Sequence, residues 1–199
     1  MPKIFKFVIS LTVALFLISN IAPSIVYAAE LSKYTENLDL SKDIDRKLSK
    51  PLEISEEQLD NLIEERRNLY SDLTEEEMKN IAYKVMSPYS TRDSIWDGKG
   101  VTLSEFAWAF DIVIGGLISG YATLGKYAAK HGVAAARSLL SRAARAAAQR
   151  VGVLSGFISG VISVAVSVVN IYYNIGYAIA QFIDARDYYR NNGRINAWA

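Results

Sequence analysis

The sequence contains no cysteine and a single histidine, His131, among its 199 residues. The absence of cysteine excludes a disulfide framework, a thiolate metal site and a cysteine nucleophile. One histidine is too few for a zinc cluster within one chain. The formal net charge of only +1 also argues against a strongly basic nucleic-acid-binding protein. We therefore expect no cofactor, no metal and no nucleic-acid partner.

Proline is missing after residue 88, and glycine is missing before residue 98. All 12 glycines lie at or after Gly98, and all four prolines lie at or before Pro88. Formal charge follows the same division, with +2 for residues 1–29, −6 for residues 30–100 and +5 for residues 101–199. The near-neutral chain is therefore an acidic part joined to a basic part.

The first thirty residues have the pattern of an export signal. Lys3 and Lys6 precede an apolar run over residues 7–18, and small residues lead up to Ala28 and Ala29. This order of positive, apolar and small residues is typical of a secretory signal peptide. We predict cleavage after Ala28, with Ala29 as the alternative position, and hence secretion. An uncleaved membrane anchor is the competing interpretation.

The acidic part predicts short amphipathic helices. Ser55-x-x-Gln58 and Thr74-x-x-Glu77 are capping boxes, and apolar residues follow each of them at helical spacing. The combined apolar faces are too small for a strong independent core, so these helices need a partner. We interpret the acidic residues as solvated, dipole-favoured first turns, and not as catalytic carboxylates or calcium ligands. The helices are expected over residues 56–70 and 75–86.

Residues 87–100 predict a linker. They contain Pro88, Gly98 and Gly100, mix both charges and have no periodicity. Such a segment is a suitable place for a second proteolytic cut. The predicted domains are therefore a signal peptide (1–28), an acidic helical propeptide with its linker (29–100) and a membrane-active helical domain (101–199).

The basic part opens with a capping box and a long apolar run. Thr102-x-x-Glu105 precedes twenty residues, 106–125, in which Asp111 is the only charge. As a helix this run would be about 30 Å long, which is the thickness of a bilayer core. Asp111 makes it a borderline transmembrane helix. Two glycines inside the run, Gly116 and Gly120, are expected to allow close helix–helix packing.

Residues 126–150 predict an alanine-rich, basic amphipathic helix. No acidic residue occurs between Asp111 and Asp184. A helix of this kind is suited to the surface of an anionic bacterial membrane. The solvated face of a helical bundle is the alternative, and His131 is expected to be a polar residue beside a helix break at Gly132. The candidate membrane-binding residues are Lys126, Lys130, Arg137, Arg142, Arg145 and Arg150.

The 33 residues from Val151 to Ile183 carry no formal charge. Small residues recur every fourth position within them, which on one helix would form a stripe for helix–helix contact, a glycine zipper. A buried hydrophobic hairpin in a helical bundle and, for residues 161–169, a buried strand are the alternatives. The candidate packing residues are Gly152, Gly156, Gly160, Ser155, Ser159, Ser163 and Ser167.

An exported chain with an acidic leader and a Gly/Ala-rich, cationic, helical C-terminal half resembles bacteriocin precursors of Gram-positive bacteria. The segment Lys126-Tyr127-Ala128-Ala129, then Gly132, then Ala135-Ala136-Arg137-Ser138-Leu139-Leu140 is similar to the closticin type. The C-terminal region here is longer and contains the glycine zipper, in which it departs from that type. The resemblance implies permeabilisation of competitors' membranes without enzymatic activity.

We therefore predict an all-α, secreted, pore-forming antibacterial precursor that is not an enzyme, because no nucleophile elbow, metal motif or phosphate loop is visible. The expected partners are an anionic bacterial membrane, signal peptidase, a second processing protease and further copies of the chain within the membrane. The alternative is a non-toxic, membrane-anchored extracytoplasmic interaction or immunity protein.

Overall fold

The structure is a computed structural model that describes residues 38–88, 100–118, 124–169 and 174–197. The chain divides into two units, residues 1–40 and residues 41–199, and every feature below belongs to the second unit. The predicted signal peptide, with Ala28 and Ala29, lies outside the described residues. Residues 89–99 of the predicted linker also lie outside them.

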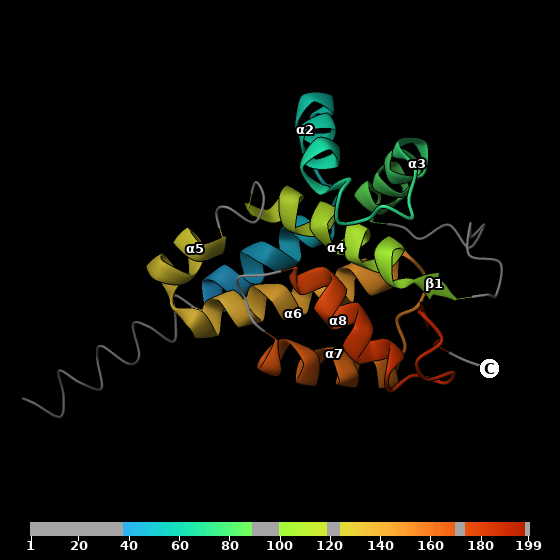
Figure 1. Cartoon of the computed structure of the whole chain (residues 1–199). Coiled ribbons are helices and arrows are strands. Elements are labelled where there is room, and N and C mark those ends of the chain that lie inside the picture. Colours follow the sequence, from blue (N-terminus) through green and yellow to red (C-terminus); the bar gives the residue numbers. More distant parts are fainter. Residues whose placement is uncertain (1–37, 89–99, 119–123, 170–173, 198–199) are drawn as a thin grey trace, which may run out of the picture. The chain divides into compact units, whose positions relative to one another are not determined.

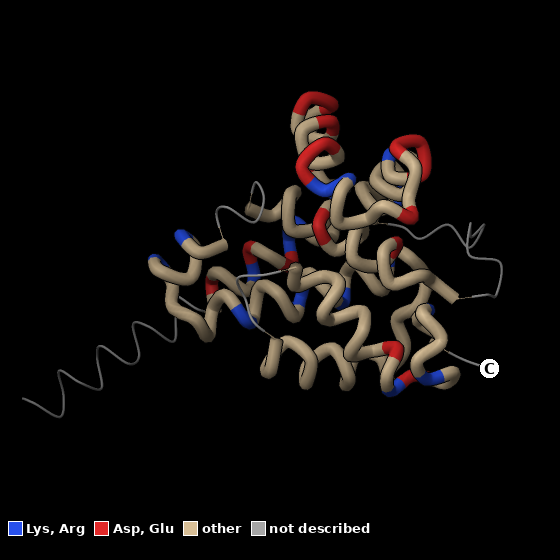
Figure 2. The backbone as a smooth tube through the Cα atoms, viewed as in Figure 1, with Lys and Arg blue, Asp and Glu red and all other residues tan. Residues whose placement is uncertain are grey.

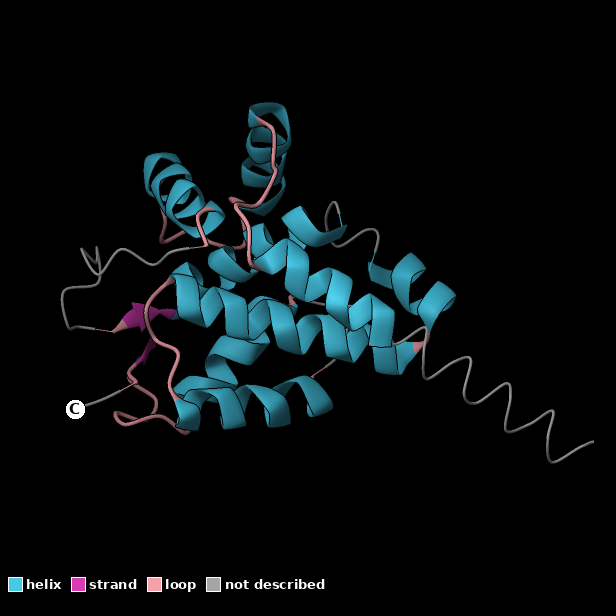
Figure 3. Ribbon diagram, turned by 180° about the vertical axis from the view of Figure 1, so that it is seen from behind, coloured by secondary structure: helices cyan, strands magenta, loops and turns pink. Residues whose placement is uncertain are grey.

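The described part is mostly helical, with little strand, which confirms the all-α prediction (Figure 3). A helix that includes residues 41–48 precedes the labelled elements of Figure 1. The elements that follow are α2 (Glu56–Arg66), α3 (Glu75–Met86), β1 (Val101–Thr102), α4 (Leu103–Ile118), α5 (Leu124–His131), α6 (Val133–Arg150), α7 (Gly156–Val168), α8 (Ile175–Asp184) and β2 (Arg194–Ile195).

Both predicted capping boxes of the acidic part are formed. The Ser55 hydroxyl accepts from the Gln58 backbone N–H, and the Gln58 side chain accepts from the Ser55 N–H at 3.0 Å. Thr74 and Glu77 make the equivalent pair at the start of α3. These reciprocal bonds satisfy amide groups that the helix itself leaves without acceptors. The first helix is shorter than predicted, since α2 ends at Arg66.

The apolar helix α4 lies at the centre of the unit. In Figure 1 it runs between α2 and α3 on one side and α6 and α8 on the other. Phe106, Trp108 and Phe110 on α4 are completely buried. The backbones of α4 and α8 approach so closely that a Cβ on Gly176 would lie 2.9 Å from the carbonyl oxygen of Ala107. A helix that is apolar on all sides needs such complete coverage in water.

The two long apolar runs of the sequence form shorter helices than expected. The first run is helical from Leu103 to Ile118, and residues 119–123 lie outside the described part. The run over 151–183 forms two helices, α7 and α8, and α7 has 13 residues. Throughout the ranges that the structure describes, no helix has both the length and the apolar character that crossing a membrane requires. This corrects the prediction of bilayer-length helices for these ranges.

The predicted basic helix is also divided. Residues 124–131 form α5, and α6 begins after Gly132, whose φ of +88° lies in the region that favours glycine. The helix break expected beside His131 is therefore confirmed. The end of the chain returns to the start of α4, where Val101 pairs with Ile195 and Arg194 donates to the Gly100 carbonyl at 3.0 Å.

Candidate functional site

The acidic helices cover α4. Acidic residues gather in the first turns of α2 and α3, whereas α7 carries neither acidic nor basic residues (Figure 2). The opposite faces of α2 and α3 are apolar and buried, with Leu59, Ile63, Met78 and Val85 among the core residues. The acidic part is therefore joined to the basic part mainly by apolar packing.

Asp111 is the polar centre of this contact. Its carboxylate is only 2% exposed and accepts a hydrogen bond from the Tyr70 hydroxyl at 2.8 Å. The Arg66 Nε atom lies 3.5 Å from the same oxygen. Burial, followed by the neighbouring carboxylate of Asp111, raises the pKa of Tyr70, so this hydroxyl remains a donor. The acidic part thus supplies two partners of the buried charge of Asp111.

Trp108 makes a second polar contact across the same surface. Its indole N–H donates to the backbone carbonyl of Met78 on α3 at 2.7 Å. Its ring also lies beside Tyr70, with the two centroids 6.2 Å apart. A buried indole N–H needs an acceptor, so this bond fixes the position of α3 along α4.

Arg150, one of the predicted membrane-binding residues, is buried. Its guanidinium donates to the backbone carbonyls of Val85 at 2.5 Å and Leu48 at 2.9 Å, with longer contacts to Met86 and Lys50. Burial lowers the pKa of Arg150 to about 10, which leaves it protonated at neutral pH. In this structure Arg150 joins the end of α6 to the acidic part.

The other candidate membrane-binding residues occupy two different environments. Lys126 and Lys130 are exposed on α5. Arg137, Arg142 and Arg145 are half-buried on α6 and contact neighbouring elements. These contacts are Arg137 to the Val166 carbonyl, Arg142 to the Asp45 carboxylate, and Arg145 to the hydroxyls of Ser159 at 2.9 Å and Ser163 at 2.6 Å.

The candidate packing residues of 152–167 do not share one helix. Gly152 follows α6 with a φ of +79°, and Ser155 is the N-cap of α7. Gly156, Gly160, Ser163 and Ser167 are exposed on α7, while Ser159 is half-buried. Among the described residues, nothing lies within 4 Å of a Cβ built on Gly156 or Gly160. The predicted stripe is therefore shorter, and its glycines face outward.

Gly116, from the first pair of candidate packing glycines, lies against the acidic part of the chain. A Cβ on Gly116 would lie 3.0 Å from atoms of Leu52, and a Cβ on the adjacent Gly115 would lie 3.1 Å from Leu62. These glycines receive apolar side chains from the acidic part of the same chain. Gly120 lies outside the described residues.

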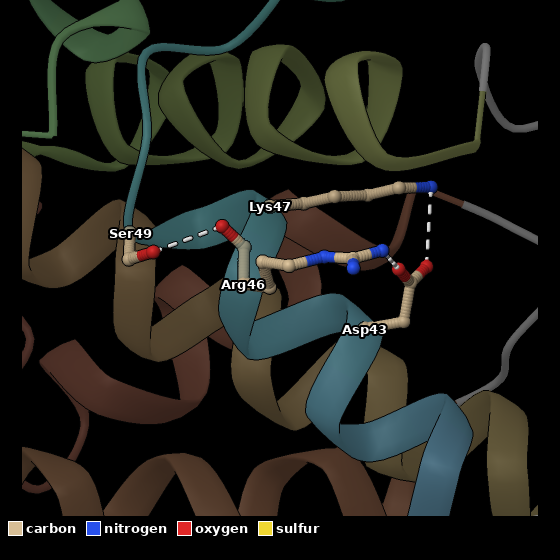
Figure 4. Close-up of polar contacts among 4 residues, drawn as sticks. All are labelled: Asp43, Arg46, Lys47 and Ser49. Atoms are coloured by element: carbon tan, nitrogen blue, oxygen red, sulfur yellow. Dashed lines mark hydrogen bonds and ion pairs between the residues drawn. The ribbon is translucent and has the colours of Figure 1, made fainter.

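Charged residues of the helix over residues 41–48 form ion pairs within the helix and with α6. Figure 4 shows Arg46 and Lys47 extending along the helix toward the carboxylate of Asp43, with nitrogen–oxygen distances of 2.5 and 3.5 Å. The hydrogen bond from Arg46 holds the pKa of Asp43 below its usual range. Ser49 donates to the Arg46 carbonyl and ends the helix. Asp45 is the acidic residue of this helix that pairs with α6, through Arg142.

The sequence pattern alone does not mark Arg66, Tyr70 or Asp45 as members of a site. Arg66 and Tyr70 belong to a predicted amphipathic helix, and their link to Asp111 spans more than forty residues of sequence. The available signal was Asp111 itself, since one carboxylate in an apolar run requires a buried partner. No family model, no curated protein and no solved structure matches this chain.

Proposed function

We propose that this protein is an exported, membrane-active antibacterial precursor whose residues 101–199 insert into and permeabilise a target membrane once the acidic part has been removed. The observation that carries the proposal is the coverage of α4. The largely apolar helix α4 is buried between the acidic helix α3 and helices α6 and α8, and two residues of the acidic part, Tyr70 and Arg66, contact its buried carboxylate, Asp111. Helices that are apolar on most sides are found both in protein cores and in membranes.

The acidic cover keeps the two parts together through a small number of identifiable contacts. Tyr70, Arg66 and the Met78 carbonyl hold α4, while Arg150 of α6 holds the carbonyls of Val85 and Leu48. Loss of residues 29–100 would remove a formal charge of −6 and uncover α4. The remaining +5 part would then be attracted to anionic lipid, with the exposed Lys126 and Lys130 available for first contact.

This mechanism gives the predicted partners separate roles. Signal peptidase would act near Ala28, and a second protease would act within residues 87–100. The exposed glycine and serine face of α7 would then be the contact between copies in the membrane. In the export form the acidic part acts mainly as an apolar cover, and Arg142 with Asp45 forms an ion pair between the two parts.

A vesicle leakage assay tests the proposal on one sample. A site for a sequence-specific protease is placed within residues 89–99, and release of an enclosed dye from phosphatidylglycerol vesicles is followed before and after cutting. We expect little release from the intact protein and rapid release after the cut. The control is the protein without the engineered site, treated with the same protease, which should remain uncut. Absence of leakage after complete separation of the two parts would refute the proposal.

The alternative is a non-toxic extracytoplasmic interaction or immunity protein. The exposed apolar residues of α7, which are Phe157, Val164 and Val168, favour it because a partner helix could pack on them. The two functions differ in the fate of the chain. A C-terminal fragment of the mass of residues 101–199 in the culture supernatant supports the toxin, whereas retention of the whole chain in the producing cell's membrane supports the alternative.

A further inference from the structure

A hollow of about 680 Å³ lies between α6 and the helix over residues 41–48. One stripe of α6 forms one wall, because Ser138, Ser141, Arg142, Arg145 and Gln149 recur at helical spacing. Asp45 stands on the opposite wall. Hydrogen-bond donors therefore line the α6 wall of the hollow, Leu48, Pro88 and Ala146 add apolar surface, and the hollow is open to solvent on one side.

The arginines around this hollow are incompletely neutralised. Arg142 pairs with Asp45. Among the described residues, Arg145 bonds to two serine hydroxyls, and Arg150, which also lines the hollow, bonds to backbone carbonyls. These neutral acceptors satisfy N–H groups without supplying negative charge. One carboxylate for three guanidinium groups leaves an excess of two positive charges beside the hollow.

We propose that this hollow is a binding pocket for a phosphate group. The guanidinium of Arg142 or Arg145 presents parallel N–H donors that match two phosphate oxygens, and serine hydroxyls and the Gln149 amide can bond the others. A phosphate carries the negative charge that the lining lacks. Asp45 limits the affinity, because its carboxylate repels the same ligand.

Two sources of this phosphate group are chemically possible, the headgroup of an anionic phospholipid and a soluble phosphate compound. The phospholipid source rests on the proposed function, since it would give the cationic helix a defined site on the membrane surface. Binding of phosphate itself does not depend on membrane activity. The experiment therefore uses inorganic phosphate, glycerol phosphate and vesicles as separate probes.

Binding of inorganic phosphate and of glycerol phosphate to the full chain is measured by isothermal titration calorimetry. Loss of a charged hydrogen-bond partner in Arg145→Ala is expected to weaken binding about tenfold or more. Arg190→Ala removes the same charge from an exposed position outside the pocket and is expected to leave binding unchanged. Asp45→Asn is expected to strengthen binding about fivefold, a gain that misfolding cannot produce.

The vesicle arm compares sedimentation of the full chain with vesicles of phosphatidylglycerol in the presence and absence of glycerol phosphate. If glycerol phosphate reduces sedimentation with vesicles, and this reduction is lost in Arg145→Ala, the phosphate group comes from the lipid. If the chain binds soluble phosphate but glycerol phosphate does not reduce its sedimentation with vesicles, the ligand is a soluble compound. No binding of either soluble probe, or equal weakening in Arg145→Ala and Arg190→Ala, would overturn the pocket. Leakage that is unchanged in Arg145→Ala would overturn the lipid source while leaving the proposed function intact. Phosphate binding without any leakage would overturn the proposed function and the lipid source while leaving the phosphate pocket intact.

Discussion

The contact between Tyr70 and Asp111 gives the sharpest test of how the acidic part holds α4. Tyr70→Phe removes one hydroxyl from a completely buried ring and leaves the packing volume almost unchanged. The hydroxyl donates at 2.8 Å to a carboxylate that is 2% exposed, so its loss removes a charge-assisted hydrogen bond from a site that water does not reach. Such bonds contribute about 1.5–3 kcal/mol, and we therefore expect a destabilisation of about 2 kcal/mol.

Urea denaturation of the full chain, followed by circular dichroism, measures this loss as a lower midpoint at an unchanged slope. For a unit of this size the same loss corresponds to a thermal shift of roughly 4–8 °C. Tyr83→Phe is the matched control, because the Tyr83 hydroxyl bonds to Glu56 at 3.0 Å but the residue is 48% exposed. We expect it to change the free energy of unfolding by less than about 0.5 kcal/mol. Equal effects of the two substitutions would refute the argument that Asp111 is held by a buried bond.

Three further predictions concern the helix contacts. Gly176→Ala should destabilise by about 1–3 kcal/mol in the same denaturation assay, because its Cβ would meet the backbone of α4. Gly160→Ala, with open space around its Cβ, should raise the free energy of unfolding by up to about 1 kcal/mol. If Gly160→Ala destabilised the protein more than Gly176→Ala, the close approach of α8 to α4 would be contradicted. Arg150→Met should cost about 3 kcal/mol by leaving buried carbonyls without donors, while Arg190→Met should stay within about 0.5 kcal/mol. Gly156→Ile should leave folding intact but abolish vesicle leakage by the separated C-terminal part. Unchanged leakage would show that contact between copies through α7 is not needed for permeabilisation.

Helix starts, helix breaks and the buried face of a helix depend on residues that are close together in the sequence. The hydroxyl of Thr74 and the carboxylate of Glu77 are three positions apart, so the capping box and the start of α3 depend on chemistry within one helical turn. The break at Gly132 and the burial of Ala136, Leu140 and Ala143 on one side of α6 are equally local. The class of the fold was therefore determined by the sequence alone.

The assignment of surfaces depended on tertiary packing. Arg150 belongs to the same basic helix as Arg142 and Arg145, yet it is buried because the acidic part brings the carbonyls of Val85 and Leu48 to it. Gly156 and Gly160 have the spacing of a packing motif, but α7 presents them to solvent while Gly176, outside any motif, makes the close contact. The spacing of residues along one helix fixes which of them share a face. It carries no information on which other helix will cover that face, and only the packed unit decides this.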